Sequence, residues 1–332
     1  MSSRSIRVRL MPVLLALIVA GCSQSGGAVE DPAASAPVAE NNAPAQPLEL
    51  GEDAPTIDQA YPRLASGVLA HARLAELPDE LLLRAGEVTV KLAEIESEIA
   101  EAPEAIREQL REHAFFLLEQ MVTERLLIQE AREAAGNASA DVSGEDLLRD
   151  HIQGVVGELS VGEDEIRQFY DDNQSLMQGM PLEVVKGQIE QTLMGRKQKA
   201  AFEDHVLSLG RRMGVAVDAD WAARQAQLAA KNPVNKARAS GKPTLASFGA
   251  DSCVPCRMMA PIREELRQAY GGRANIIYVR VDEEQILAAR YGVHGIPHLI
   301  FFGPDGREVM QQTGIMTKEQ IEAQFAAMGV EN

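Results

Sequence analysis

The feature that most constrains the fold of this chain is a pair of cysteines, Cys253 and Cys256, placed where an apolar run gives way to a helical pattern. The apolar run, residues 243–248, predicts a buried strand. We therefore expect a strand to deliver Cys253 to the start of a helix, where unpaired backbone N–H groups and the macrodipole favour a thiolate. One helical turn then brings Cys256 close enough to form a disulfide and to resolve a mixed one. Pro255 suits that turn because it lacks an N–H.

The residues alone leave three interpretations of this pair. A zinc site would need a second Cys/His pair at metal-ligand spacing, but the third cysteine is Cys22, and His294 and His298 form no such pair. A buried structural pair of thiols is the second interpretation. A redox-active dithiol, the third, fits the strand-to-helix position best. We therefore expect no metal site and no cofactor other than the cysteine pair itself.

Residues 241–332 resemble a thioredoxin domain. The resemblance rests on Cys-Val-Pro-Cys, with Ser-Phe-Gly-Ala before it and Met-Met-Ala-Pro after it. It continues with a strand over residues 276–281 followed by Asp282, Tyr-Gly-Val-His-Gly-Ile-Pro at residues 291–297, and Gly314. The resemblance implies an α/β fold in which helices flank a mixed central sheet.

The resemblance also implies roles for the segment that ends at Pro297. In thioredoxins this proline is cis and lies against the cysteines, and a cis X–Pro bond is uncommon enough to indicate a function. Ile296 is then expected to offer backbone groups to an extended substrate chain, and Pro297 to keep metal ions off the thiols, with Gly295 and Pro255 as supporting residues. The two histidines that flank this turn could tune the thiols near neutral pH, or be ordinary structural histidines.

Four positions depart from the usual thioredoxin pattern. Ser252 stands where a tryptophan usually precedes the first cysteine, and Gly249 stands at a second usual tryptophan. Ser247 replaces the buried carboxylate that accepts a proton in thioredoxins, and Tyr278 replaces its lysine partner. We expect the fold and the dithiol to carry over, but not the usual proton relay.

Residues 1–21 have the pattern of a targeting segment. Three arginines precede an apolar stretch, residues 10–20, that is too short to span a bilayer comfortably. The Val-Ala-Gly-Cys that follows resembles a bacterial lipobox, which implies cleavage before Cys22 and lipidation of its thiol; a plain signal peptide is the alternative. The implied location is the periplasm of a Gram-negative cell, anchored to a membrane by lipid, with Ser23 favouring the outer membrane.

The composition of residues 22–60, rich in Ala, Pro, Ser, Gly, Asn and Glu, predicts a disordered tether, because it offers too little apolar surface to bury. Residues 61–82 regain leucines, and we expect a short helix over residues 64–75. Farther along, residues 218–240 predict a connecting helix that breaks at Pro233.

Residues 83–217 predict a mostly helical domain. After a short strand at 86–90, apolar side chains recur at helical spacing up to a stop signal at Gly136. Later helices are expected to begin near Ser143, Val161 and Pro181, and residues 214–217 suit a closing strand. The helix that follows Pro181 should bury one face, made of Val184, Ile189, Leu193, Phe202, Val206 and Leu209.

This order of elements resembles the N-terminal chaperone domain of SurA and related parvulin-type peptidyl-prolyl isomerases. The segments that carry the resemblance are residues 86–95, 117–133, 163–173 and 181–189. In that family an isomerase domain usually separates the last two pieces, whereas here only residues 174–180 do. The resemblance therefore implies a client-binding domain without isomerase activity. Met177 and Met180 could line an adaptable apolar surface there, or fill a core or loop.

The net charge of −17 excludes some classes of partner. A chain this acidic does not hold nucleic acid or an anionic bilayer by charge, although it could favour basic or neutral clients. The sequence also lacks a Gly-rich phosphate loop, a Ser/His/Asp arrangement and a dinucleotide fingerprint.

The sequence therefore predicts a multidomain protein of the α + α/β class, with a SurA-like helical domain followed by a thioredoxin-fold domain. Its expected function is thiol–disulfide exchange on unfolded or disulfide-bearing periplasmic polypeptides, with a membrane or periplasmic redox partner. The alternative is a non-catalytic chaperone, or holdase, in which Cys253–Cys256 is a structural bond. A third interpretation is a reductase for cytochrome maturation or metal delivery whose helical part is only a spacer.

Overall fold

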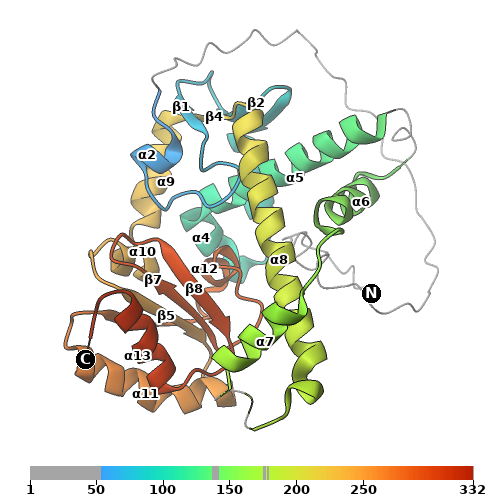
Figure 1. Ribbon diagram of the computed structural model, residues 1–332. Coiled ribbons are helices and arrows are strands. Elements are labelled where there is room, and N and C mark those ends of the chain that lie inside the picture. The colour runs from blue at the N-terminus through green and yellow to red at the C-terminus, as the bar shows by residue number, and fades with distance from the viewer. Residues whose placement is uncertain (1–53, 137–141, 175–176, 178, 332) are drawn as a thin grey trace, which may run out of the picture.

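The computed structural model describes residues 54–136, 142–174, 177 and 179–331, which form two units packed against each other (Figure 1). The predicted signal segment, Cys22 and most of the predicted tether lie outside the described residues. Within the described part of the chain, no helix is both long and apolar enough to cross a membrane. The first unit is mostly helical, and the second contains a four-stranded sheet.

The first unit carries a small four-stranded sheet whose strands come from distant parts of the chain. The strands are β1 (Arg73–Ala75), β2 (Leu81–Ala85), β3 (Val88–Lys91) and β4 (Ala216–Asp218). Their order is β1-β4-β2-β3, with β1 and β4 parallel and the other two pairs antiparallel. The predicted closing strand is confirmed as β4, while the predicted strand at 86–90 begins only at Val88, because Gly86 adopts a positive φ of 59° in the turn before it.

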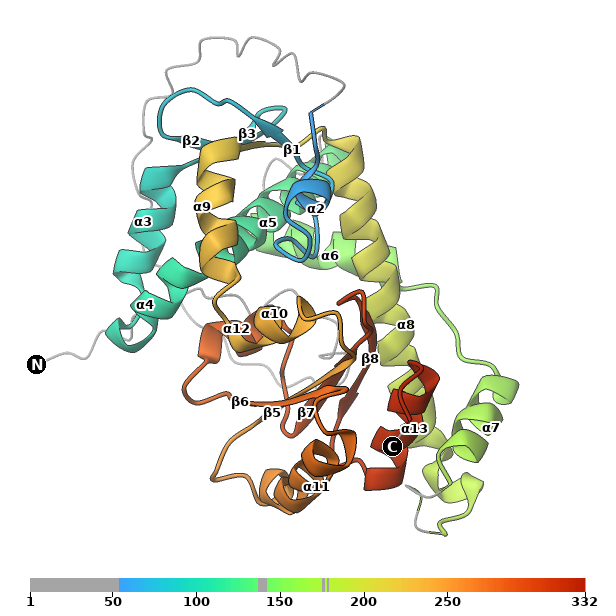
Figure 2. The ribbon, with the colours of Figure 1, turned by 90° about the vertical axis from the view of Figure 1, so that its left-hand side faces the viewer.

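Helices make up the long insertion between β3 and β4. They are α3 (Leu92–Glu101), α4 (Glu104–Glu112), α5 (Ala114–Ala135), α6 (Gly144–Val156), α7 (Glu163–Asp172) and α8 (Leu182–Arg212). Two predicted boundaries are confirmed: α5 ends at Gly136, and α6 begins after Ser143, whose side chain accepts the backbone N–H of Asp146. Helix α8 extends from the small sheet down along the side of the second unit (Figures 1 and 2).

The core of the first unit forms where α5 meets α8 and α9 (Ala219–Ala229). Leu118, Val122 and Leu126 of α5 are fully buried in it. The ring of Phe115 stacks on that of Trp221 in α9, with centroids 5.9 Å apart. The apolar repeat seen in the sequence is therefore the face that α5 presents to this core.

Two predictions for the start of the folded region are wrong. Residues 64–75 form turns and strand β1, not a helix. The predicted tether also does not reach residue 60, because α2 (Ile57–Ala60) belongs to the first unit. Ile57 is fully buried in the core, and its N–H donates to the carbonyl of Ala72 at 2.8 Å. This single apolar side chain, in a polar stretch, was too weak a signal to detect.

Helix α7 and the start of α8 form a hairpin with a small core of their own. Ile166, Val185 and Ile189 are buried there, and Met177 packs partly against them. Met180 is 42% exposed and Val184 is 70% exposed. The prediction that Val184 belongs to the buried face of α8 is therefore wrong, since the neighbouring Val185 takes that place.

The second unit has the sheet order β6-β5-β7-β8. Its strands are β5 (Thr244–Gly249), β6 (Asn275–Arg280), β7 (His298–Phe302) and β8 (Glu308–Thr313). Strand β5 pairs parallel with β6 and antiparallel with β7, and β7 pairs antiparallel with β8, so the sheet is mixed as predicted.

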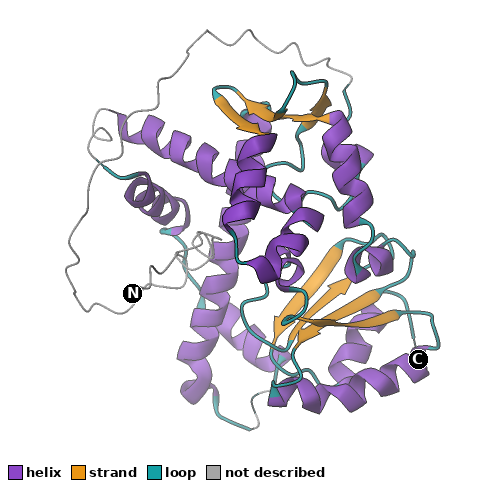
Figure 3. Ribbon diagram, turned by 180° about the vertical axis from the view of Figure 1, so that it is seen from behind, coloured by secondary structure: helices purple, strands orange, loops and turns teal. Residues whose placement is uncertain are grey.

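Helices cover both faces of this sheet (Figure 3). Helices α11 (Val254–Tyr270) and α13 (Lys318–Ala327) pack on one face, where Leu266 and Phe325 are fully buried against Phe301. Helices α10 (Pro233–Arg238) and α12 (Gln285–Arg290) pack on the other, where Val234 and Leu287 are fully buried. The connecting segment thus divides at Pro233: α9 belongs to the first core and α10 to the second.

Helix α12 joins the two units. The side chain of Ile286 is buried in the core of the first unit. Gln109 of α4 donates to the carbonyl of Glu283 at 2.8 Å and accepts the N–H of Ile286 at 3.1 Å. Arg290 donates to the carbonyls of Arg63 and Leu64, at 2.6 and 3.0 Å. The second unit is therefore fixed to the first by apolar contact and by hydrogen bonds at both ends of one short helix.

Candidate functional site

The two cysteines lie where the chain passes from strand β5 to helix α11. Cys253 is the N-cap of α11, and its sulfur accepts the backbone N–H of Cys256 at 3.2 Å. The two form a disulfide with a Cα–Cα distance of 5.2 Å, and Pro255 lies in the first helical turn. The predicted position of Cys253 at the start of the helix is confirmed, and the N–H of Cys256 together with the helix dipole stabilises negative charge on its sulfur.

The two sulfurs differ in their access to solvent. Cys253 is partly exposed, while Cys256 is only 1% exposed. A thiol–disulfide exchange needs an in-line approach to the attacked sulfur, so Cys253 is the one that an external disulfide can reach. Cys256 can reach only the sulfur of Cys253, which suits a resolving thiol.

The predicted proline turn lies beside the cysteines. The Ile296–Pro297 peptide bond is cis, and the carbonyl oxygen of Ile296 is 3.8 Å from the sulfur of Cys253. The residue that follows strand β8 stabilises this turn, because the carbonyl of Pro297 accepts the N–H of Gly314 at 2.8 Å. Gly295 is close-packed, since a Cβ on it would lie 3.2 Å from a methyl of Thr313. The structure thus brings together all the site residues that the sequence predicted in the second unit.

A group of polar side chains lies behind Cys256. A Cβ on Gly249 would lie 2.9 Å from the hydroxyl oxygen of Tyr278 and 3.0 Å from the sulfur of Cys256. The missing side chain of Gly249 thus leaves room for the Tyr278 hydroxyl to approach Cys256. Ser247 is the register partner of Tyr278, is fully buried, and its hydroxyl has no hydrogen-bond partner within the described residues.

Arg263 completes this group and was missed in the sequence. Its guanidinium lies 4.1 Å from the ring centroid of Tyr278 and donates to the carbonyl of Cys256 at 3.4 Å. Burial raises the pKa of the Tyr278 hydroxyl, and the Arg263 charge opposes this effect. The hydroxyl is therefore protonated at neutral pH and can donate. Arg263 follows Cys256 by two helical turns, so both residues lie on the same face of α11. This spacing is the one signal in the sequence by which Arg263 could have been found.

The two histidines near the proline turn have different environments. His294 is exposed. His298 is 4% exposed, and its Nδ1 lies 2.8 Å from the Thr313 hydroxyl. Burial lowers the pKa of His298, so its ring is neutral at physiological pH. This neutral, buried ring fits a structural role for His298 in strand β7.

Apolar side chains surround Cys253 on the surface. Val254 and Met258, one turn apart on α11, are 56% and 60% exposed. Ile315, next to the Gly314 that holds the proline turn, is 36% exposed. Exposed apolar groups around a partly exposed thiol offer contact area to a polypeptide chain.

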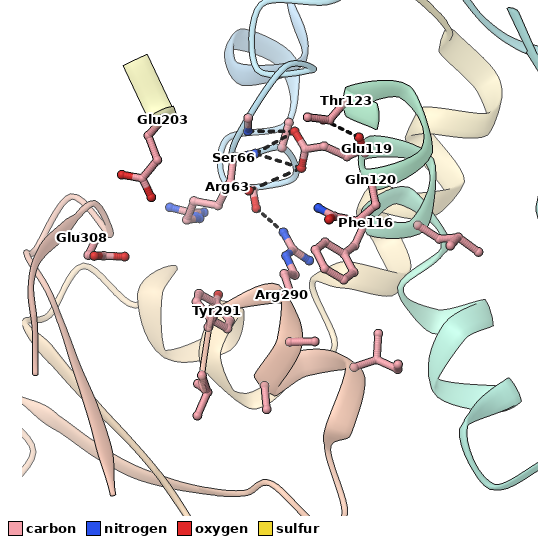
Figure 4. A pocket seen from close by; sticks show the side chains of 18 of the residues that line it. Arg63, Ser66, Phe116, Glu119, Gln120, Thr123, Glu203, Arg290, Tyr291 and Glu308 are labelled. Carbon is pink, nitrogen blue, oxygen red and sulfur yellow. Dashed lines mark hydrogen bonds between the residues drawn. The ribbon is translucent and has the colours of Figure 1, made fainter. Parts of the chain in front are cut away.

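A cavity of about 1410 Å³ lies between the two units (Figure 4). The first unit lines it with apolar side chains of α5 and α8, among them Phe116, Met121 and Phe202. The second unit lines it with the chain from α12 to His294, three residues before the cis proline. The cavity is larger than the roughly 300–1,000 Å³ typical of small-molecule sites, so it has room for an extended chain segment.

A buried carboxylate fixes one wall of this cavity. Glu119 of α5 is 3% exposed and accepts the backbone N–H groups of Ser66, Gly67 and Leu69, at 2.8 to 3.4 Å (Figure 4). Burial raises the pKa of Glu119, and these hydrogen bonds and the charge of Arg290 oppose the rise. The carboxylate therefore anchors the loop at residues 66–69, which stands opposite Arg290 in the cavity.

Comparisons with known proteins match the carboxy-terminal part of the chain to thioredoxins. A thioredoxin family model matches residues 225–327. A thioredoxin of Alicyclobacillus acidocaldarius is 44% identical over 85 residues, which cover 26% of this chain and 80% of that protein. A thiol:disulfide interchange protein TxlA homolog of Synechocystis is 32% identical over 124 residues, covering 37% and 69%. Among solved structures, a mutant thioredoxin of Halobacterium salinarum is 32% identical, with 28% and 80% covered and a TM-score of 0.26.

Proposed function

Because the chain belongs to the thioredoxin family, we propose that it exchanges disulfides with polypeptides that its helical unit holds near Cys253. Thiol–disulfide oxidoreductase chemistry follows from the family and from the cysteine pair, which needs no cofactor. One observation carries the proposal: the sulfur of Cys253 is partly exposed and accepts the backbone N–H of Cys256, and Cys256 itself is buried.

The exchange proceeds in two displacements. In the reducing direction, the Cys253 thiolate attacks one sulfur of a client disulfide, forms a mixed disulfide and releases the other client sulfur as a thiolate. Cys256 then loses its proton and attacks the sulfur of Cys253. This step releases the second client thiol and leaves the Cys253–Cys256 disulfide seen in the structure. In the oxidising direction the same steps run in reverse.

We assign client binding to the cavity and the apolar surface around Cys253. The cavity is lined by aromatic and aliphatic side chains together with charged ones, among them Glu203, Arg290 and Glu308, and it reaches His294 in the segment before the proline turn. A client segment held there has a raised effective concentration at the dithiol. The backbone carbonyl of Ile296, 3.8 Å from the Cys253 sulfur, is available to pair with an extended client strand.

The net charge of −17 supports a preference for basic or neutral clients. Asp251 and Glu283 pair with Arg280, at 3.4 and 2.9 Å, which partly neutralises them, so the local support comes from Glu284. Burial, together with repulsion from Glu112 and Glu283, raises the pKa of Glu284. A basic client segment would relieve this repulsion, whereas an acidic one would add to it.

The remaining parts of the proposal rest on the sequence. We place the protein in the periplasm, tethered to a membrane through lipid on Cys22, with the tether giving it reach. We also propose that it has no peptidyl-prolyl isomerase activity, because residues 174–180 replace the domain that would carry it. A membrane or periplasmic thiol partner would restore the dithiol after each cycle.

A trapping experiment tests the exchange mechanism. Cys256→Ser removes the resolving thiol, so Cys253 should remain bound to clients as a mixed disulfide that reducing agent releases. The matched control is the Cys253→Ser/Cys256→Ser double variant, which should trap none. If Cys256→Ser captures no disulfide-bearing protein in cells, the exchange mechanism is wrong.

The holdase alternative is favoured by one observation. Ser247 stands where a proton-accepting carboxylate would be expected, and its hydroxyl is fully buried. In a holdase, the double Cys-to-Ser variant would suppress aggregation and rescue a deletion strain fully, whereas in an exchange enzyme it would not rescue. The reduction potential of the pair separates the other interpretations: about −270 mV indicates a reductase, and about −120 mV a disulfide donor. A pair that resists reduction until the protein unfolds would indicate a structural bond.

A further inference from the structure

A side-chain cluster in the first unit has the composition of a transition-metal site. Glu130 of α5, His151 of α6 and His205 of α8 converge, and their ligand atoms all lie within 4.8 Å of one another. Oε2 of Glu130 is 3.0 Å from Nε2 of His151 and 2.7 Å from Nε2 of His205. The side chains of His151, His205 and Glu130 are 17%, 20% and 22% exposed, so the cluster is recessed but open to solvent.

We propose that Glu130, His151 and His205 bind one divalent transition-metal ion, for which Zn²⁺ is the best fit. Two imidazoles and a carboxylate are the protein ligands that zinc takes in sites where the fourth position is left to water. Metal–ligand distances of about 2.0–2.2 Å place neighbouring ligand atoms of a tetrahedral site roughly 3.3 Å apart. Each imidazole nitrogen therefore has to withdraw from the carboxylate oxygen by a few tenths of an ångström, and the two imidazole nitrogens, which lie within 4.8 Å of each other, have to adopt the same separation.

The surroundings of Glu130 prepare it as a ligand. Arg212 holds its other oxygen, Oε1, at 2.5 Å, which leaves Oε2 turned towards both imidazoles. Such an outer partner orients a ligating carboxylate. Arg212 is 50% exposed, so solvent screens its repulsion of a bound cation.

An ion in this position would act as a crosslink. The three ligands come from three helices, and α6 is attached to α5 through residues 137–141. Glu130 is separated from His151 by 21 residues and from His205 by 75. A bound ion would therefore fix α6 against α5 and α8, in the unit to which we assign client binding. This inference does not depend on the thiol chemistry of the second unit.

Metal binding to the full-length chain tests the proposal. The Cys253–Cys256 disulfide is kept oxidised and any free thiol is alkylated, so that sulfur cannot bind the ion. Zn²⁺ titrated by calorimetry at pH 7.5 should bind with one equivalent per chain and raise Tm. Binding should weaken at pH 5.5, because protons compete for the imidazoles. His151→Gln and His205→Gln should each weaken it by at least about tenfold.

A matched control and a second measurement keep the test decisive. His71→Gln alters an exposed histidine of the same unit and should leave the affinity unchanged. If the ligand variants do not fold, as judged by far-UV circular dichroism, Co²⁺ added to the wild-type chain decides. Tetrahedral nitrogen and oxygen coordination would give visible absorption bands that Zn²⁺ abolishes. The proposal is overturned if the wild-type chain binds neither ion, or if folded His151→Gln and His205→Gln variants bind Zn²⁺ as tightly as wild type does.

Discussion

At the scale of single residues, a tyrosine and the buried cysteine share the space that a side chain on Gly249 would fill. A Cβ there would touch both the Tyr278 hydroxyl and the Cys256 sulfur, and Arg263 lies over the tyrosine ring. We expect Tyr278→Phe to raise the pKa of the Cys256 thiol and to slow resolution of the mixed disulfide. We expect the Tyr278 hydroxyl to donate to Cys256 once the disulfide is reduced, and the loss of such a donor, about 1 kcal/mol, corresponds to roughly a fivefold change in rate. The alkylation rate of Cys256 against pH, in a Cys253→Ser background, measures the shift.

The control for this prediction is Tyr61→Phe, a tyrosine of the first unit. An unchanged thiol pKa in Tyr278→Phe would show that the hydroxyl takes no part. The sequence identified the substitutions at Ser247, Gly249 and Tyr278, but not how these residues fit together, because a residue type does not reveal the space that its neighbour leaves empty. Arg263 was overlooked for the same reason: an arginine on a helix face usually points to solvent, whereas here it is 6% exposed.

Gly249→Ala should strain the same contact. The added Cβ would lie within about 3 Å of both the Tyr278 hydroxyl and the Cys256 sulfur, so one of them has to move. Overpacking of this kind costs on the order of 1–3 kcal/mol, which chemical denaturation of the oxidised protein would detect. In a Tyr278→Phe background the cost should be smaller, because the hydroxyl is gone, although the ring carbon Cε2, which would lie 3.0 Å from the added Cβ, and the Cys256 sulfur remain. Equal costs in both backgrounds would argue against the contact.

At the scale of elements, the joint between α4 and α5 makes stability depend on pH. His113 ends α4 and is 4% exposed. Burial and the charge of Arg290 lower its pKa from 6.5 to about 4. Between these pH values His113 is protonated in the unfolded chain but not in the folded chain. The free energy of unfolding should therefore fall as the pH falls from about 6.5 to about 4. We expect roughly 2 kcal/mol of this contribution to be lost between pH 7 and pH 5.

Unfolding free energies of wild type and His113→Gln at the two pH values measure this contribution. The variant should lose less stability on acidification, and the difference between the two proteins isolates His113 from other groups. The comparison matters because burial raises the pKa of Glu119. Protonation of Glu119 on acidification therefore stabilises the folded chain, which is opposite to the effect of His113. A parallel loss in both proteins would show that His113 does not carry the effect.

The elements themselves were predicted unevenly. Helices α5, α6 and α8 were found because their apolar residues repeat over several turns and their ends carry signals such as Ser143 and Gly136. Strands β1 and β2 were missed, since each is short and its partner β4 is more than a hundred residues away. The thioredoxin unit was predicted nearly in full from its motifs. The likeness of the first unit to a SurA chaperone domain stays a prediction.

At the scale of the whole molecule, α12 determines how the two units sit. Gln109→Ala removes two hydrogen bonds to the segment from Glu283 to Ile286 and should loosen the interface. We expect faster hydrogen exchange in α4 and α12, with the rest of each core unchanged. Gln268→Ala serves as control, because its side chain bonds only within α11. Identical exchange in the two variants would show that Gln109 does not hold the units together.

Neither this interface nor the cavity beside it was predicted from the sequence. Gln109 and Glu283 are separated by 174 positions, and neither has a residue type that marks a contact. The surface of α12 could be recognised as part of a thioredoxin fold, but not as the site where a second unit docks. Ile286 shows why: a buried isoleucine on this helix could serve either core, and here it serves the core of the other unit.

The position of β4 has a consequence for biosynthesis. This strand completes the first sheet by lying between β1 and β2, yet it follows them by the whole helical insertion. A nascent chain that has emerged only as far as α8 therefore lacks the central strand of its first sheet. The thioredoxin unit, by contrast, uses only residues from α10 onward for its sheet and both covering layers. The amino-terminal unit, although made first, thus leaves the edges of β1 and β2 that pair with β4 without a partner until residue 218 arrives.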